Sequence, residues 1–274
     1  MGNEKLPIGV LDSGVGGLTV VKEILQLMPL ESVVYFGDSK RMPYGNRKEE
    51  EIIFLANKII RFLENKGVKG ILLACNTVSS QINKLKSRVP LFGIIEAGCL
   101  AVQERSPKKE IGLIATVATV QSKVYEYTMN QLDPTKKIIS NDSRKLPKVI
   151  NNQLEHKYLL NKHIRECIDP ILQQGEIEDL ILGCSHFPII QNEIQAIYPN
   201  LKLINPANKQ VFMIKKYLEE NNLYTKGKSR SHIEILTTEG VQEFKLTLQR
   251  LHIQDYTIER VELLKEDDDG NHHR

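Results

Sequence analysis

The sequence lacks any apolar run approaching the roughly 20 residues that a membrane-spanning helix needs, and its first residues contain no signal-peptide core. It also lacks a concentrated basic stretch. The formal net charge is only +3, and Lys and Arg are scattered among Asp and Glu. These absences argue against a membrane or a nucleic acid as partner. We therefore expect a cytosolic protein that acts on a small molecule.

Cysteine is scarce, with four thiols at positions 75, 99, 167 and 184. No CxxC pair or other metal-ligand spacing links them, and cytosolic thiols are normally reduced. We therefore expect neither structural disulfides nor a metal site. Residues 265–274 form an acidic and then His-containing tail, for which we expect disorder and no metal role.

The rest of the chain has an ordinary globular composition, 41% hydrophobic and 26% charged, and its 274 residues suffice for two medium domains. Short apolar runs alternate with segments of helical periodicity. Strands are expected at 8–11, 33–36, 70–75, 91–95, 110–116, 180–182, 201–204, 233–236 and 256–261, and helices at 18–28, 49–65, 77–86, 120–132, 159–173, 211–218 and 242–251. Residues 96–98 are expected to break the pattern. This alternation predicts an α/β fold with mainly parallel sheets covered by helices on both faces.

Two pairs of segments indicate an internal duplication. Residues 70–77, GILLACNT, match residues 179–186, DLILGCSH, so that Cys75 corresponds to Cys184. Residues 7–13 similarly match 110–116, with Gly9 corresponding to Gly112. The glycines lie 103 positions apart and the cysteines 109, which favours two pseudo-symmetric copies.

The duplication predicts two domains, joined near residues 107–109. The elements after residue 207 outnumber what the second copy needs, so we expect them to complete the first domain. The expected limits are 6–98 with 208–264 for the first domain and 99–207 for the second.

Cys75 and Cys184 each follow an apolar strand, where open α/β sheets place ligands and reactive groups. A helix N-terminus after such a strand stabilises a thiolate and lowers the pKa of the thiol. Each copy also offers a helper, Asp12 in the first and His186 in the second. By contrast, Cys99 and Cys167 have no such context and are expected to be buried filler.

Two bases on opposite sides of one ligand suit inversion of configuration at carbon. One base removes a proton while the other returns a proton to the opposite face. Hydrogen-bond donors to an adjacent carboxylate would stabilise the carbanion without metal or cofactor. The candidate donors, each of which is also a common capping or turn residue, are Ser13, Asn76, Thr77, Thr119 and Ser185.

Five motifs follow one another in the chain: Leu11-Asp12-Ser13-Gly14-Val15-Gly16-Gly17, Gly37-Asp38 with Pro43-Tyr44-Gly45, Ala74-Cys75-Asn76-Thr77, Thr116 to Ser122, and Leu182-Gly183-Cys184-Ser185-His186-Phe187-Pro188. In residues and order they resemble the motifs of the glutamate racemase family, within the aspartate/glutamate racemase superfamily, and the resemblance covers residues 7–260. The resemblance implies cofactor-independent interconversion of L- and D-glutamate, which supplies D-glutamate for peptidoglycan. It also implies two pseudo-symmetric α/β domains with the active site in the cleft between them, and a homodimer.

By the same resemblance, Cys75 deprotonates D-glutamate and Cys184 deprotonates L-glutamate, with Asp12 and His186 assisting. The substrate contacts that the resemblance implies are Ser13, Pro43, Tyr44, Gly45, Asn76, Thr77, Thr119 and Ser185.

The chain departs from the family pattern at several positions. Ser185 replaces a usual threonine and Phe187 a usual tyrosine, while Ala115 and Ala118 replace two glycines; Ala97 stands where proline is usual. The acidic residue that many members place about 32 positions before the second cysteine corresponds here to Asn151 or Asn152. If that carboxylate supports His186, its loss is expected to slow the L-to-D direction.

Two other functions fit the same pattern. One is racemisation of aspartate or another amino acid on the same fold. The other is a catalytically dead protein that binds an amino acid and regulates a partner, although both thiols and both helpers are present. A hydrolase with a single catalytic cysteine would leave the second copy unexplained.

Overall fold

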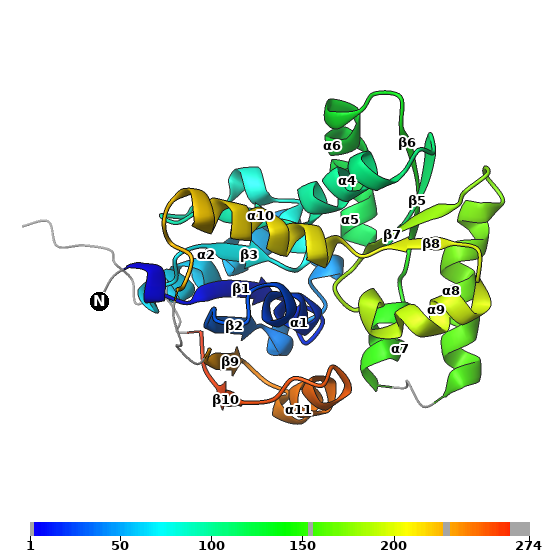
Figure 1. Cartoon of the computed structure of the whole chain (residues 1–274). Coiled ribbons are helices and arrows are strands. Elements are labelled where there is room, and N and C mark those ends of the chain that lie inside the picture. Colours follow the sequence, from blue (N-terminus) through cyan, green and yellow to red (C-terminus); the bar gives the residue numbers. More distant parts are fainter. Residues whose placement is uncertain (1–2, 153–155, 227–230, 264–274) are drawn as a thin grey trace, which may run out of the picture.

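The computed structural model describes residues 3–152, 156–226 and 231–263, and contains two separate parallel sheets, each covered by helices (Figure 1). The α/β fold expected from the sequence is therefore confirmed. The tail expected at 265–274 lies outside the described residues.

The first sheet has six strands in the order β10-β9-β2-β1-β3-β4, all parallel. Its strands are β1 (Ile8–Asp12), β2 (Val33–Gly37), β3 (Ile71–Leu73), β4 (Leu91–Gly93), β9 (Ile233–Thr237) and β10 (Tyr256–Arg260). Strands β2 and β9 lie side by side although about 200 residues separate them (Figure 1). The C-terminal segment thus returns to the first sheet, as expected.

Helices cover both faces of this sheet, and we call the whole assembly the first lobe. One face packs on α1 (Leu18–Leu27), α10 (Pro206–Glu220) and α11 (Val241–Arg250), and the other on α2 (Glu49–Asn65). Residues in its strands alternate between the two hydrophobic clusters, with Val10 facing one and Leu11 the other. Because both faces are buried, inner strands such as β1 and β2 are continuous apolar runs, which made them visible in the sequence.

The second lobe is built on a four-stranded parallel sheet in the order β6-β5-β7-β8. Its strands are β5 (Glu110–Ala115), β6 (Lys137–Asp142), β7 (Asp179–Gly183) and β8 (Lys202–Ile204). One face packs on α4 (Ile94–Arg105) and α6 (Val124–Leu132), and the other on α7 (Leu146–Asn152), α8 (Lys157–Leu172) and α9 (Gln191–Ile197).

The two sheets repeat one topology. The order β2-β1-β3-β4 in the first lobe corresponds to β6-β5-β7-β8 in the second, so that β3 and β7 occupy equivalent places. Each of these two strands leads directly to a cysteine. The expected boundaries near residues 98 and 207 fall within α4 and α10, which pack on one another, and the domain limits themselves stay a prediction.

Three expectations about local structure are wrong, and two elements were missed. The helix expected at 77–86 is only α3 (Asn76–Ser79) followed by a 3-10 turn (Ile82–Lys84). Residues 96–98 do not break the pattern, because they lie inside α4. The helix expected at 120–132 is divided into α5 (Val117–Gln121) and α6 at Lys123, whose φ is 54°. Finally, β6 and α7 were not expected at all.

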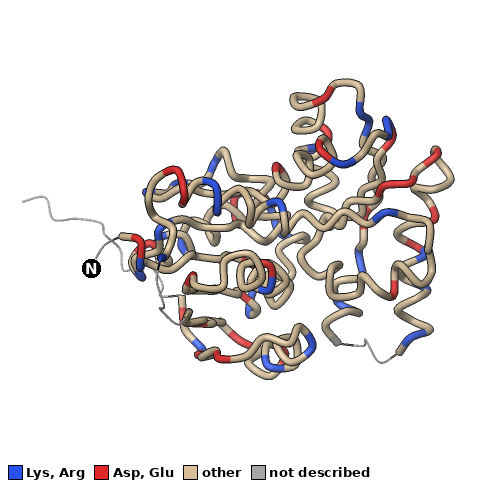
Figure 2. The backbone as a smooth tube through the Cα atoms, in the orientation of Figure 1, with Lys and Arg blue, Asp and Glu red and all other residues tan. Residues whose placement is uncertain are grey.

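Charges of both signs are interspersed over both lobes (Figure 2). Within the part of the chain that the structure describes, no helix is both long and apolar enough to cross a membrane.

A buried ion pair closes the first lobe at the amino-terminal ends of its strands. Lys69 Nζ lies 2.5 Å from Glu31 Oε2, and both side chains are 1% exposed. The same ammonium donates to the carbonyls of Glu4 and Leu223, while Thr225 N–H donates to Glu31 Oε1. This network fixes the chain where it leaves α10 to return to the first sheet.

We expect Lys69→Met to lower the free energy of unfolding by about 3–5 kcal/mol, because it leaves the Glu31 carboxylate buried without its cation. The matched control is Lys66→Met, which removes a partly exposed ion pair with Glu234 and should cost less than about 1 kcal/mol. Urea unfolding curves measure both. Equal losses of unfolding free energy in Lys69→Met and Lys66→Met would contradict the conclusion that burial makes the Lys69–Glu31 pair more important.

Candidate active site

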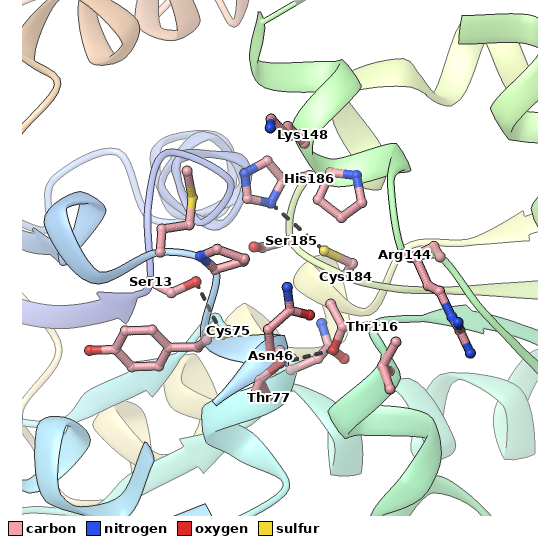
Figure 3. A pocket seen from close by; sticks show the side chains of 18 of the residues that line it. Ser13, Asn46, Cys75, Thr77, Thr116, Arg144, Lys148, Cys184, Ser185 and His186 are labelled. Carbon is pink, nitrogen blue, oxygen red and sulfur yellow. Dashed lines mark hydrogen bonds between the residues drawn. The ribbon is translucent and has the colours of Figure 1, made fainter. Parts of the chain in front are cut away.

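A cavity of about 430 Å³ lies where the carboxyl ends of strands from both lobes meet (Figure 3). The first lobe contributes to its wall Ser13, Met42, Pro43, Tyr44, Gly45, Asn46, Cys75, Asn76 and Thr77, and the second contributes Thr116, Val117, Ser143, Arg144, Pro147, Lys148, Asn151, Cys184, Ser185 and His186. The two cysteines that the duplication singled out therefore share one cavity.

Cys75 is separated from the end of β3 by Ala74 alone and stands at the N-cap of α3. Its side chain is 5% exposed, and its Sγ lies 3.5 Å from Ser13 Oγ, to which the thiol can donate. Ser13 follows β1, the strand beside β3. Adjacent parallel strands thus bring the thiol and the hydroxyl together at one edge of the sheet.

Cys184 occupies the equivalent place after β7 and is 6% exposed. Its Sγ lies 3.7 Å from His186 Nδ1, and Nε2 of that ring is buried without a hydrogen-bond partner among the described residues. In Figure 3 the Ser13–Cys75 pair and the Cys184–His186 pair approach the cavity from opposite lobes.

The expectation of lowered thiol pKa values is wrong for this structure. Burial raises the pKa of Cys75 to about 11, and the charge of Asp12 adds to the shift. Burial also raises the pKa of Cys184 well above its ordinary value, and the nearby Cys75 adds to it. The backbone N–H groups of Thr77 and Val78 favour the Cys75 thiolate, but α3 is a single turn and its effect is smaller than that of desolvation.

Burial also shifts the pKa values of the two expected helper residues, Asp12 and His186. Asp12 is fully buried at the end of β1, and desolvation raises its pKa to about 6, although the Gly14 N–H donates to Oδ1 at 2.9 Å. The Asp12 side chain is not part of the cavity wall and acts on Cys75 from behind it. For His186, burial lowers the pKa to about 4, so the imidazole is neutral at pH 7.

The lobes touch closely around the cavity. The hydroxyl oxygens of Thr77 and Thr116 lie 3.0 Å apart across the interface (Figure 3). A Cβ on Gly16 would approach Ser185 Oγ to 2.4 Å, and one on Gly45 would approach Thr116 Cβ to 2.8 Å. Glycine at these two positions therefore lets the lobes approach closely enough to enclose the cavity.

A buried carboxylate holds the loop that carries Pro43 and Gly45. Asp38 accepts hydrogen bonds from the Tyr44 hydroxyl at 2.7 Å, from Arg41 at 2.8 Å and from Thr238 at 2.8 Å. The Tyr44 hydroxyl is thus engaged by Asp38, and only other parts of that residue can serve the substrate contact expected of it.

Ten of the twelve residues expected at the site line the cavity; the exceptions are Asp12 and Thr119. Thr119 is fully buried, and its hydroxyl lies 3.0 Å from that of Thr116, which takes the place in the cavity wall. The remaining lining residues were missed. Of these, Thr116 and Val117 stood within a recognised motif and Asn46 directly followed one. Among residues 143–151 the sequence pointed only to Asn151, as one of two candidates for the family's acidic position, because no element was expected there.

Residues 143–151, which were not expected at the site, contribute basic residues to the cavity wall. Among the described residues of the wall, Arg144 and Lys148 are the basic side chains and no carboxylate is present. Arg144 lies 3.1 Å from Asp142, at the end of β6. Asn151, one of two candidates for the family's acidic position, lines the cavity; its Oδ1 is buried without a hydrogen-bond partner among the described residues.

A family model described as Asp/Glu/Hydantoin racemase matches residues 8–211. The chain belongs to this family. Among its relatives, glutamate racemase 2 of Caldanaerobacter subterraneus subsp. tengcongensis is 37% identical over 240 residues, which cover 87% of this chain and 90% of the relative.

Two solved structures of the family are also similar. Glutamate racemase isoform RacE1 from Bacillus anthracis has a TM-score of 0.88 at 30% identity, with 95% of this chain and 98% of that chain covered. The glutamate racemase from Francisella tularensis, solved in complex with D-glutamate, has a TM-score of 0.85 at 30% identity, with the same coverage.

The buried imidazole predicts a pH dependence of stability. Between pH 4 and 6.5 the unfolded chain binds the His186 proton and the folded chain does not, so this group makes stability rise with pH across that window. We expect the free energy of unfolding of the wild type to gain about 2–3 kcal/mol more than that of His186→Asn between pH 4.5 and 7.5.

Denaturant curves at the two pH values measure the difference. Asp12, with its pKa raised to about 6, gives the opposite dependence but is present in both proteins. The control His252→Asn changes an exposed histidine and should follow the wild type. Parallel pH profiles for the wild type and His186→Asn would contradict a buried neutral imidazole.

Proposed function

We propose that this protein racemises glutamate by a two-base mechanism that uses no cofactor. The observation that carries the proposal is the placement of Cys75 and Cys184 at equivalent strand ends of two repeated lobes, in one shared cavity. Glutamate racemases that align over most of the chain support the choice of reaction.

In the proposed reaction, one thiolate removes the proton from Cα, and the opposite thiol delivers its own proton to the other face. The bound amino acid is thereby inverted, and the two sulfurs exchange protonation states. Following the family, Cys75 acts on D-glutamate and Cys184 on L-glutamate. Asp12 and His186 assist the thiol of their own lobe.

The raised thiol pKa values fit this chemistry in one respect and constrain it in another. A thiolate with a pKa near 11 is a stronger base toward the weakly acidic Cα–H than an ordinary one. It cannot, however, form alone in a buried site. The α-ammonium of the substrate supplies a nearby cation, and we propose that its arrival stabilises the thiolate.

The carbanion requires hydrogen-bond donors at the α-carboxylate. Ser13, Asn76, Thr77 and Ser185 line the cavity beside the two thiols and offer hydroxyl and amide N–H groups. Arg144, which is paired with Asp142, and Lys148 are exposed basic residues of the described wall, and we propose that they attract a substrate with two carboxylates. Pro43, Tyr44 and Gly45 complete the wall on the side of the first lobe.

The physiological role follows from the product. D-glutamate is a component of peptidoglycan, and we propose that the protein supplies it in the cytoplasm as a homodimer. Aspartate is the other dicarboxylic substrate to be tested, since it carries the same charges on a side chain shorter by one methylene group.

The purified protein should convert either enantiomer of glutamate to the racemate without added pyridoxal phosphate or metal. Circular dichroism or polarimetry follows the loss of optical activity, and aspartate is assayed at equal concentration. We expect glutamate to be turned over at least about tenfold faster, since a single methylene can change binding by that factor. Faster aspartate turnover would change the substrate assignment. Tight binding of one enantiomer with no turnover would favour a catalytically dead binding protein.

Replacing either thiol should abolish racemisation but leave exchange at one face. In D2O, we expect Cys184→Ala to exchange the α-proton of D-glutamate and Cys75→Ala that of L-glutamate, because each variant keeps one base. Proton NMR measures both. The control Cys167→Ala removes a buried thiol outside the cavity wall and should keep activity. Full racemisation by either active-site variant would disprove the two-base mechanism.

A further inference from the structure

A hydrogen bond crosses the interface between the lobes directly beside the catalytic cavity. Tyr125, on α6 of the second lobe, places its hydroxyl 2.7 Å from Oδ1 of Asn76, on α3 of the first lobe. The Tyr125 side chain is fully buried and Asn76 is 2% exposed. Gly98 of α4 leaves room for the phenol, since a Cβ there would approach Tyr125 Cε1 to 3.1 Å.

The amino group of the Asn76 amide, in contrast to its oxygen, has no protein partner among the described residues. Nδ2 of Asn76 is buried and has no hydrogen-bond partner among the described residues, although Asn76 lines the cavity beside Cys75. Buried amide N–H groups are rarely left without an acceptor. An unpartnered donor in the wall of the cavity indicates a site for an acceptor oxygen of a ligand, such as one of a carboxylate.

The phenol decides which end of the amide is available. An asparagine amide carries an acceptor at one end and two donors at the other, and the two orientations are nearly equal in shape. Burial keeps the pKa of the Tyr125 hydroxyl well above its ordinary value, so the hydroxyl stays protonated and can donate. Donation to Oδ1 leaves the N–H groups for the ligand, whereas the flipped amide would direct its oxygen at an anion.

The equivalent position in the second lobe needs no such partner. Ser185 follows Cys184 as Asn76 follows Cys75, and it also lines the cavity. A serine hydroxyl can rotate to donate to whatever acceptor is bound, but an amide must be held in one orientation to act as a donor. Tyr125 therefore serves a requirement that arises only on the Cys75 side.

We propose that Tyr125 is a positioning residue, which holds the Asn76 amide with its N–H groups toward a carboxylate of the substrate. The inference rests on the proposed racemisation of an amino acid. Because Tyr125 belongs to the opposite lobe, the donor is oriented only while the two lobes are packed together.

A double-mutant cycle tests the proposal. We expect Tyr125→Phe to lower kcat/KM for D-glutamate about tenfold, since the amide loses the partner that fixes its orientation. Asn76→Ala should lower it by at least as much. In the Asn76→Ala background, Tyr125→Phe should change kcat/KM less than about twofold, because no amide remains to be oriented. Hydrogen–deuterium exchange at Cα, followed by NMR, extends the measurement to slow variants.

The control is Tyr198→Phe, which removes a phenol bonded to Asp169 elsewhere in the second lobe and should keep kcat/KM. Thermal unfolding checks each variant, and Asn76→Ser replaces Asn76→Ala if the latter does not fold. Equal losses from Tyr125→Phe in both backgrounds, or no loss in the wild type, would overturn the proposal. A wild type without glutamate turnover would instead contradict the proposed function, and the cycle would then be run on D-glutamate affinity by calorimetry.

Discussion

The burial of two thiols between the lobes is the constraint on which the site depends. Cys75 and Cys184 are nearly inaccessible because each ends a strand at the edge where two sheets meet. Desolvation then raises the pKa of both thiols and couples them, so that charge on Cys75 disfavours charge on Cys184. Burial alone therefore keeps both thiols protonated near pH 7, and the coupling disfavours ionisation of both together, so that a cation arriving at the site would leave one thiolate and one thiol, as a two-base reaction requires.

The two lobes have equivalent frameworks, but the proposed helper groups beside their cysteines differ. A carboxylate, Asp12, lies behind Cys75, while an imidazole, His186, lies beside Cys184. Burial shifts each helper toward its neutral form, raising the pKa of Asp12 to about 6 and lowering that of His186 to about 4. Near pH 7 the His186 imidazole is neutral, whereas Asp12, with a pKa of about 6, is mostly ionised and disfavours a thiolate at Cys75 until the ammonium of a bound amino acid supplies a cation.

The sequence predicted what depends on short-range pattern. Parallel strands buried on both faces appear as apolar runs, so β1, β3, β5 and β7 were found with the cysteines that follow two of them. Strand β6 was missed because it is an edge strand containing Lys137, Ser140, Asn141 and Asp142, which give no apolar run. Arg144, Lys148 and Asn151 were missed as cavity residues for the same reason, since they follow that strand. Thr119 lies behind Thr116 and the Tyr44 hydroxyl bonds to Asp38; these residues are only three and six positions apart, but the motifs do not show in which direction their side chains point.

The structure changes the expected effect of having Asn151, rather than the family's acidic residue, in the cavity wall. The amide leaves the His186 imidazole without a nearby negative charge from that segment, and the low pKa of His186 agrees with this. The sequence suggested that such a loss would slow the L-to-D direction. Because the two enantiomers are equal in free energy, kcat/KM must have the same value in both directions. A weaker Cys184 half must lower both together, and an asymmetry between the lobes can appear only as a compensating difference in kcat and KM for the two enantiomers.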